Sequence, residues 1–249
     1  GGQINITDEI ENWPGVQHAT GPELGNMFRE HALKFNTEIR IADVKKVELR
    51  DGKKIVVTDK GDIEAEAIIV ATGAHFRRLG CEGEAEHIGQ GVSFCAVCDG
   101  AFYEGEEVAV VGGGNTAVEE ALYLANIANT VTLIHRRDSF RAEKIMVDKL
   151  MRRVEEGKII LKTEAVLEEV LGDDSGVTGA RLKFNDGHSE DITVKGVFIA
   201  IGHKPNTDIF KGQLDMDDAG YLKTKGGSGD NVGATNIEGI WAAGDVKDH

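Results

Sequence analysis

One stretch of the chain, residues 107–134, most constrains how the protein can fold. Glu107–Val111 is a short apolar run, and Gly112–Gly114 then form a turn. From Asn115 to Ala128 apolar residues recur at spacings of three and four, which is one face of a helix. A second apolar run, Thr130–Ile134, follows. The apolar helix positions are Val118, Ala121, Leu122, Ala125 and Ala128. This order is typical of a βαβ unit and predicts an α/β fold with a parallel sheet.

The turn itself fits the phosphate-binding pattern G-x-G-x-x-G/A. Its residues are Gly112, Gly113, Gly114, Asn115, Thr116 and Ala117. In this pattern the first glycine permits the turn and the second lets a pyrophosphate approach the backbone at the helix N-terminus. Asn115 or Thr116 is expected to cap the helix. An ordinary tight turn is the alternative interpretation, but the strand, helix and second strand around it favour a dinucleotide site.

The end of the second strand indicates which dinucleotide binds. An NAD site places an Asp or Glu about 20 residues beyond the glycines, where it binds the ribose 2′-hydroxyl. This chain instead has His135, Arg136 and Arg137, followed by Arg141. Guanidinium groups pair with phosphate, so the pattern favours the 2′-phosphate of NADPH. A solvated basic loop without a ligand is the alternative.

The chain contains only three cysteines, and two of them form the motif Cys95-Ala96-Val97-Cys98. A C-x-x-C pair in a chain poor in cysteine and without secretory features indicates a redox-cycling dithiol. Asp99 follows directly and could donate a proton to a leaving thiolate. Zinc is the alternative, because Cys81, His87, Cys95 and Cys98 supply four possible ligands. The looser spacing of the first two makes zinc the weaker interpretation, and we expect no metal.

Charge and hydropathy exclude some classes of function. The chain of 249 residues has 28 basic and 43 acidic residues, a net charge of −15. This balance argues against a general binder of nucleic acid or of anionic membranes. The longest apolar runs are far too short to span a bilayer. With no signal-like segment, we expect a cytoplasmic protein.

The remaining pattern suggests that one domain is inserted into another. A second helix is expected over residues 142–155, with Ile145, Leu150, Met151 and Val154 facing inward, and several strands follow it. Ala67–Gly73 and Val197–Gly202 are similar apolar runs that each end in glycine, and they bracket the βαβ unit. We therefore expect an outer domain of residues 1–76 and 203–249, and an inner domain of residues 77–202.

Several motifs together carry a family resemblance. They are Gly1-Gly2-Gln3, Glu11–Gly15, Ala71–Ala74, Cys95–Gly100, Gly112–Ala117, His135–Arg137, Phe140–Glu143 and Ala242–Val246. In this order they closely resemble low-molecular-weight thioredoxin reductases, which use FAD and NADPH, across essentially the whole chain. The resemblance implies two Rossmann-like, three-layer nucleotide-binding domains, with the NADPH domain inserted into the FAD domain. It also implies thioredoxin as the protein substrate and a homodimer.

The resemblance further implies a role for each matching residue. Cys98 would face the flavin, Cys95 would attack the disulfide of thioredoxin, and Asp99 would be the acid. The implied NADPH contacts are Gly112, Gly113, Gly114, Asn115, Thr116, His135, Arg136, Arg137 and Arg141. The implied FAD contacts are Gly2, Gln3, Asn12, Thr72, Gly73, Gly244 and Asp245. Cys98 and Gly112 are 14 residues apart on the inner domain, so rotation about the crossings near residues 76 and 203 would let them alternate at the flavin.

The chain departs from the family pattern at its two ends. Family members carry a Gly-rich FAD loop before the Gly-Gly-Gln segment and a helix beyond the end of this chain, so we expect an incomplete FAD domain. The residues leave two other functions open. One is an NADH-linked flavoprotein reductase of a peroxide-reducing system, against which Arg136 and Arg137 argue. The other is a zinc-bound or redox-inactive interaction module.

Overall fold

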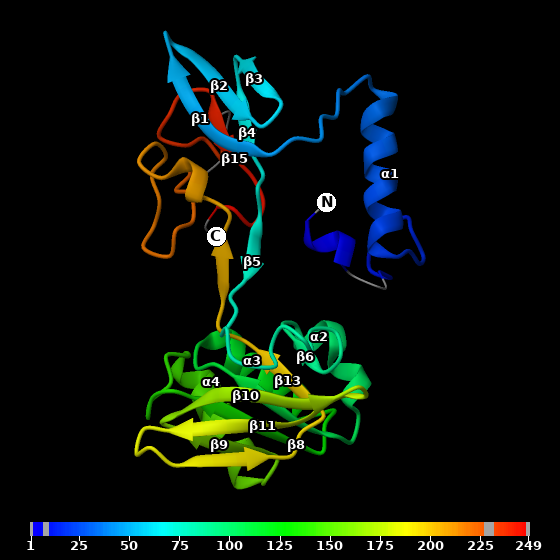
Figure 1. Cartoon of the computed structure of the whole chain (residues 1–249), viewed down its shortest axis with the longest axis vertical. Coiled ribbons are helices and arrows are strands. Elements are labelled where there is room, and N and C mark those ends of the chain that lie inside the picture. The colour runs from blue at the N-terminus through cyan, green and yellow to red at the C-terminus, as the bar shows by residue number, and fades with distance from the viewer. Residues whose placement is uncertain (1, 7–9, 227–231, 248–249) are drawn as a thin grey trace. The chain divides into compact units, whose positions relative to one another are not determined.

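The computed structural model describes residues 2–6, 10–226 and 232–247, and it divides into two compact units (Figure 1). The outer unit contains Gly1–His75 and Lys204–His249, and the inner unit contains Phe76–His203. The two crossings lie within one residue of the positions expected from the sequence. At the crossings, β5 (Ala74–Phe76) and β14 (His203–Pro205) pair with each other. Gly1 and His249, which belong to the expected outer domain, lie outside the described residues.

The inner unit is built on a five-stranded sheet. The order is β6 (Val92–Ser93), β13 (Gly196–Ile199), β7 (Glu107–Val111), β8 (Thr130–His135) and β9 (Ile159–Thr163). Every neighbouring pair in this sheet is parallel. The βαβ unit predicted from the glycine turn therefore forms the centre of the sheet, as β7, α3 (Asn115–Leu124) and β8.

Two different layers cover the two faces of this sheet (Figure 1). Successive residues of a strand point to opposite faces. Val108 and Val110 of β7 accordingly pack with α3 and α4 (Lys144–Glu155), whereas Ala109 and Val111 pack with a second, antiparallel sheet. That sheet consists of β10 (Ala165–Asp173), β11 (Gly176–Phe184) and β12 (Ser189–Ile192). The arrangement confirms the predicted three-layer α/β fold for this unit.

Details of the two predicted helices need correction. The regular helix α3 ends at Leu124, although Ala125 and Ala128 remain buried as expected. Gly114, with no side-chain cap, is the N-cap, since the Asn115 side chain accepts the Glu143 N–H instead. The helix α4 begins at Lys144 rather than Ala142.

The prediction of which α4 residues face inward was also partly wrong. Ile145 and Met151 were expected inside but are 61% and 42% exposed. Leu150 is fully buried, and Met146 and Val154, four residues before and after it, pack against the same core. The spacing of four residues selects this row, and Ile145 and Met151 lie on its flanks.

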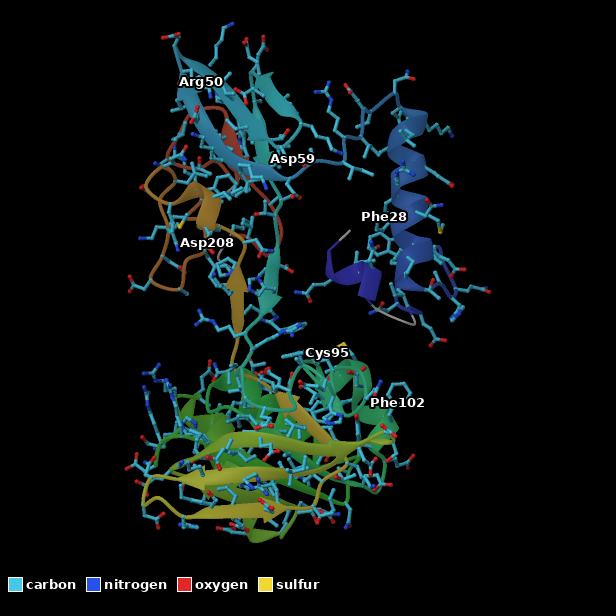
Figure 2. All side chains as sticks on the ribbon, viewed as in Figure 1. Phe28, Arg50, Asp59, Cys95, Phe102 and Asp208 are labelled. Atoms are coloured by element: carbon cyan, nitrogen blue, oxygen red, sulfur yellow. A yellow bond between two sulfur atoms is a disulfide. The ribbon has the colours of Figure 1, made fainter. Side chains whose placement is uncertain are left out.

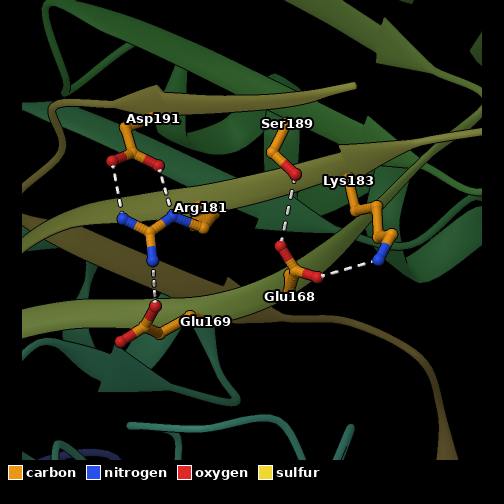
Figure 3. Close-up of polar contacts among 6 residues, drawn as sticks. All are labelled: Glu168, Glu169, Arg181, Lys183, Ser189 and Asp191. Carbon is orange, nitrogen blue, oxygen red and sulfur yellow. Dashed lines mark hydrogen bonds and ion pairs between the residues drawn. The ribbon is translucent and has the colours of Figure 1, made fainter. Parts of the chain in front are cut away.

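Charged side chains cross the three strands of the antiparallel sheet (Figure 3). The strand register places Arg181 opposite both Glu169 and Asp191. Its guanidinium binds Asp191 through two hydrogen bonds of 2.8 and 2.9 Å and Glu169 through one of 2.6 Å. The guanidinium lowers the pKa of the Asp191 carboxyl. Exposed pairs of this kind add little stability, so their main effect is a polar outer face.

The outer unit surrounds the insertion in the sequence. β4 (Ile68–Val70) precedes the inner unit, β15 (Ile240–Ala242) follows it, and the two strands pair in parallel. Val47, Val70, Phe210, Leu222 and Ile240 are among the residues of their shared core. The other elements are η1 (Gln3–Ile6), α1 (Gly21–Lys34), the antiparallel strands β1 (Val44–Arg50), β2 (Lys53–Thr58) and β3 (Gly61–Ala65), and η3 (Asp208–Phe210).

Candidate active site

The cysteine motif forms a disulfide at the start of a single helical turn, α2 (Ala96–Asp99). Cys95 is the N-cap of this turn, and the Cys98 N–H donates a hydrogen bond to Cys95 Sγ over 3.2 Å. The sulfur of Cys95 thus lies where a thiolate would be stabilised by a backbone amide. Cys98 is exposed and Cys95 half-buried.

The zinc alternative does not fit this geometry. Two of its four ligands, Cys95 and Cys98, are joined to each other. Among the residues that the structure describes, no group of three or more His, Cys, Asp or Glu side chains could hold a metal ion. Cys81 is a half-buried free thiol, and burial raises its pKa to about 11. It is therefore an unreactive cysteine rather than a third ligand.

A serine that the sequence analysis missed holds Asp99 beside the disulfide. Ser93 Oγ donates to Asp99 Oδ2 over 2.5 Å and accepts the Cys95 N–H over 3.1 Å. Ser93 is buried at the end of β6. No motif marks it, since its role depends on the turn that follows the strand. The serine ties the carboxylate of Asp99 to the backbone of the redox turn.

The three glycines of the turn differ in how much space a side chain would have at their positions. A Cβ on Gly112 would lie 2.3 Å from the carbonyl oxygen of Ala200, and one on Gly113 would lie 2.1 Å from the ring of His135. A Cβ on Gly114 would meet nothing within 4 Å. Gly112 and Gly113 are therefore required by packing, whereas Gly114 leaves open space at the N-terminus of α3. That space and the free N–H groups of the first helical turn fit a pyrophosphate.

The expected 2′-phosphate loop folds back onto this turn. The Arg141 N–H donates to the Gly113 carbonyl over 2.8 Å, and the Glu143 N–H donates to Asn115 Oδ1 over 2.7 Å. Arg136 and Arg141 are exposed and Arg137 is half-buried. Within the described part of the chain, none of these three arginines has an acidic side chain as an ion-pair partner. The donor set fits a phosphate beside the glycine turn.

His135, expected as a nucleotide contact, lies buried beneath Gly113. Its Nε2 is 3.0 Å from the Ser139 carbonyl oxygen, and its ring stacks on Phe140 with centroids 5.2 Å apart. Burial lowers the pKa of His135. The neutral ring supports the loop and the glycine turn from below.

Most of the expected FAD contacts gather at one edge of the outer unit. Thr72 and Gly73 follow β4, and Gly244 and Asp245 follow the parallel strand β15, so all four lie at the carboxyl ends of the two strands. This edge is where open α/β sheets bind ligands. Gln3 joins it, since its Nε2 donates to the Ala74 carbonyl over 2.8 Å.

The chemistry of this edge fits a flavin nucleotide. Asp245 and Thr72 are exposed, and a Cβ on Gly244 or Gly73 would meet nothing within 4 Å. An open, polar edge with a carboxylate suits the hydroxyl groups of a ribityl chain. Gly2 is exposed beside Gln3. Asn12 is exposed in the segment before α1, and no hydrogen bond described for this chain joins it to the other candidates.

Comparison with known proteins finds similar proteins along the whole chain. The family model of the pyridine nucleotide-disulphide oxidoreductases matches residues 1–249. A protein named glucosaminate ammonia-lyase from Pseudomonas fluorescens is 58% identical over 250 residues, which cover 100% of this chain and 78% of that protein. A thioredoxin reductase from Escherichia coli O157:H7 is 53% identical over 252 residues, with the same coverage of 100% and 78%.

A solved structure shows that the similarity extends to the three-dimensional fold. The thioredoxin reductase from Streptococcus pyogenes MGAS5005 superposes with a TM-score of 0.80 at 41% identity, covering 100% of this chain and 79% of that one. The disulfide next to a helical turn, the glycine turn between parallel strands and the match along all 249 residues agree with one another. The chain belongs to the pyridine nucleotide-disulphide oxidoreductase family.

Proposed function

We propose that the protein is a thioredoxin reductase that uses NADPH and FAD to reduce the disulfide of thioredoxin through Cys95 and Cys98. The observation that carries this proposal is the Cys95–Cys98 disulfide, which lies in the same compact unit as the glycine turn and the arginine loop. The open edge formed by Thr72, Gly73, Gly244 and Asp245 would hold FAD, which would supply the two-electron link between NADPH and the disulfide. The remaining chemistry belongs to residues of the chain.

Thiol–disulfide exchange accounts for the second half of the reaction. In the oxidised pair Cys95 Sγ accepts the Cys98 N–H, and the same N–H would stabilise a thiolate on Cys95 once the pair is reduced. Its attack breaks the substrate disulfide and forms a mixed disulfide, and Asp99 protonates the sulfur that leaves. Cys98 then attacks Cys95 Sγ, which releases the second substrate sulfur as a thiol and restores the Cys95–Cys98 disulfide. Two electrons and two protons pass to the substrate.

The surface around the disulfide supports a protein as the substrate. Val97, between the two cysteines, is 72% exposed, and Phe102, four residues beyond Cys98, is 82% exposed. Figure 2 shows Cys95 and Phe102 in the same region of the inner unit. Exposed apolar side chains around a reactive group are typical of a protein docking surface.

Two alternatives are less well supported. Arg136, Arg137 and Arg141 favour NADPH over the NADH-linked reductase of a peroxide-reducing system. The most similar relative described above is named as a lyase. Elimination of ammonia has no need of a redox disulfide, so the disulfide favours the reductase. Ammonia release from glucosaminate, measured on the same preparation, distinguishes the two activities.

Three further features belong to this proposal. We infer that the glycine turn and the disulfide take turns at the flavin by rotation about the crossings at β5 and β14, since one compact unit carries both groups. A homodimer is supported by apolar side chains that α1 exposes, among them Met27 and Leu33.

A cytoplasmic location is supported by the sparse cysteines and the need for NADPH. No described helix is long and apolar enough to cross a membrane.

Replacing Cys98 with serine tests the function directly. In protein saturated with FAD, Cys98→Ser is expected to abolish the reduction of thioredoxin by NADPH, because the mixed disulfide cannot be resolved. NADPH is still expected to bleach the flavin absorbance. Cys81→Ser is the matched control and should retain both activities, since Cys81 lies outside the redox turn. Thioredoxin reduction that survives in Cys98→Ser would refute the assignment.

A further inference from the structure

Glu120 is a half-buried residue with one fully buried carboxyl oxygen, and the proposed reaction does not yet use it. It lies on α3, which packs against the turn that carries the disulfide: a Cβ on Gly100, just after α2, would meet Leu124 and Tyr123 of α3 within 3.0–3.2 Å. The backbone N–H of Ala96 interacts with the Glu120 carboxyl and opposes the rise of its pKa. Among the described residues, no hydrogen-bond partner reaches the buried Oε2 of this carboxyl. A carboxylate in this position lacks the solvation that its charge requires.

The carboxyl group and the sulfur of Cys95 share one helical turn. The first turn of α2 presents backbone N–H groups that have no partner within the helix. The Cys98 N–H binds Cys95 Sγ, and the N–H of Ala96, the residue next to Cys95, interacts with the Glu120 carboxyl. Ala96 itself is fully buried. Negative charges on the sulfur and on the carboxyl would therefore lie close together in a poorly solvated place, where they repel each other.

The protonation of Glu120 responds to this environment near neutral pH. Burial raises the pKa of Glu120 to about 7, against the opposing effect of the Ala96 N–H. The elements packed against α3 carry several titratable or charged groups: Cys95, Cys98, Asp99 and Tyr103 in and beside the redox turn, Glu107 on β7, His135 on β8, and Lys144, Asp148, Lys149, Arg152, Arg153 and Glu155 on α4. Lys149, Arg152 and Arg153 line a groove with Glu119 and Tyr123 and not with Glu120.

We propose, on the basis of the proposed function, that Glu120 is a positioning residue that takes up a proton when the Cys95–Cys98 disulfide is reduced. With a dithiol as the reductant, the sulfur–sulfur bond breaks and two electrons pass from the dithiol, which becomes a disulfide. Cys95 becomes a thiolate. Of the two protons released by the dithiol, one goes to Cys98 and the other to the carboxylate of Glu120. The redox equilibrium of the pair is thereby coupled to pH.

The sign of the effect follows from the charges. At pH 6 Glu120 is protonated before and after reduction, so a neutral Gln in its place changes little. At pH 8 the oxidised protein carries a carboxylate that opposes the Cys95 thiolate, and Gln removes this opposition. The equilibrium constant for reduction in Glu120→Gln, divided by that of the unmodified chain, should therefore rise from about one at pH 6 to about fivefold at pH 8.

The experiment equilibrates the 249-residue chain with fixed ratios of reduced and oxidised dithiothreitol at pH 6, 7 and 8. The thiols are then trapped by alkylation and counted by mass spectrometry. The ratio of variant to unmodified chain cancels the titration of the buffer, and no flavin is required. Glu119→Gln, one position along α3 and exposed, is the matched control. Its ratio should stay near one at every pH.

A rise confined to Glu120→Gln supports the proposal, even if reduction of thioredoxin is absent, in which case only the proposed function fails. A ratio that is the same at all three pH values overturns it, because a purely structural role shifts the equilibrium at every pH alike. An equal rise in Glu119→Gln also overturns it. A pair that never exchanges with the dithiol in the unmodified chain overturns both this proposal and the proposed function.

Discussion

At the scale of single residues, the arginine loop is the feature with the most direct physical consequence. Arg136, Arg137 and Arg141 have no acidic partners within the described residues, and the Arg141 backbone is bonded to Gly113. A phosphate ligand would find these guanidinium groups uncompensated and close to the glycine turn. Each charge-assisted hydrogen bond contributes about 1.5–3 kcal/mol when well formed, and exposure favours the lower value.

We expect Arg136→Gln and Arg137→Gln together to weaken NADPH by about 3 kcal/mol, on the order of a hundredfold, with little change for NADH. The reason is that only NADPH carries the 2′-phosphate. The measurement is the Kd of both nucleotides by titration calorimetry, at low and at high salt, since salt screens the attraction. The control, Arg152→Gln with Arg153→Gln, removes the same charge from α4. Equal losses for NADPH and NADH would mean that the loop does not bind the phosphate.

How far the sequence predicts a site residue depends on where its partners lie in the chain. Cys95, Cys98 and Asp99 are neighbours, so their association could be inferred from spacing alone. Ser93 and Glu120 reach the same turn through tertiary packing, from β6 and from α3. Glu119 and Glu120 are adjacent identical residues, and the docking of α2 leaves Glu120 half-buried while Glu119 stays exposed. Such residues become visible only in the structure.

At the scale of elements, the glycine turn separates two requirements that the sequence pattern combines. Gly113 is needed because the buried ring of His135 fills the space in which a side chain would lie. A side chain at Gly114 would meet no protein atom within 4 Å, and we propose that this glycine is needed for the approach of a pyrophosphate. The strand and helix around the turn could be predicted from periodicity. The division of roles could not, because it depends on the side chain that reaches the turn from β8.

Two alanine substitutions test this division. Gly113→Ala should destabilise the chain by about 1–3 kcal/mol, because the His135 ring, held by Ser139 and Phe140, cannot move away. Gly114→Ala should leave the free energy of unfolding within about 0.5 kcal/mol and should weaken NADPH at least tenfold, since its methyl group points into the proposed pyrophosphate space. Urea unfolding and nucleotide titration measure the two effects. A loss of stability in Gly114→Ala equal to that in Gly113→Ala would contradict the assignment.

At the scale of the whole molecule, the chain has separate hydrophobic cores. Two cores belong to the inner unit, on the two faces of its parallel sheet, and a third is formed by the outer unit. The insertion could be predicted from the two strands that end in glycine. The antiparallel layer β10–β12 was harder to place, because the strands expected after the second helix give no indication of which face of the parallel sheet they cover. Separate cores allow the units to unfold separately.

The last prediction concerns this independence. In differential scanning calorimetry the chain should unfold in two transitions, and NADPH should shift only the one that belongs to the inner unit, which holds the glycine turn and the arginine loop. At 100 times its Kd, NADPH adds about 2.7 kcal/mol to the stability of the unit that binds it. For a unit of this size the Tm should rise by about 10 °C. In the Arg136→Gln, Arg137→Gln variant the same NADPH concentration should give little shift, whereas the other transition should stay fixed in both proteins. A single transition that NADPH moves as a whole would show that the two units unfold together and that the inner unit is not an independent nucleotide-binding body.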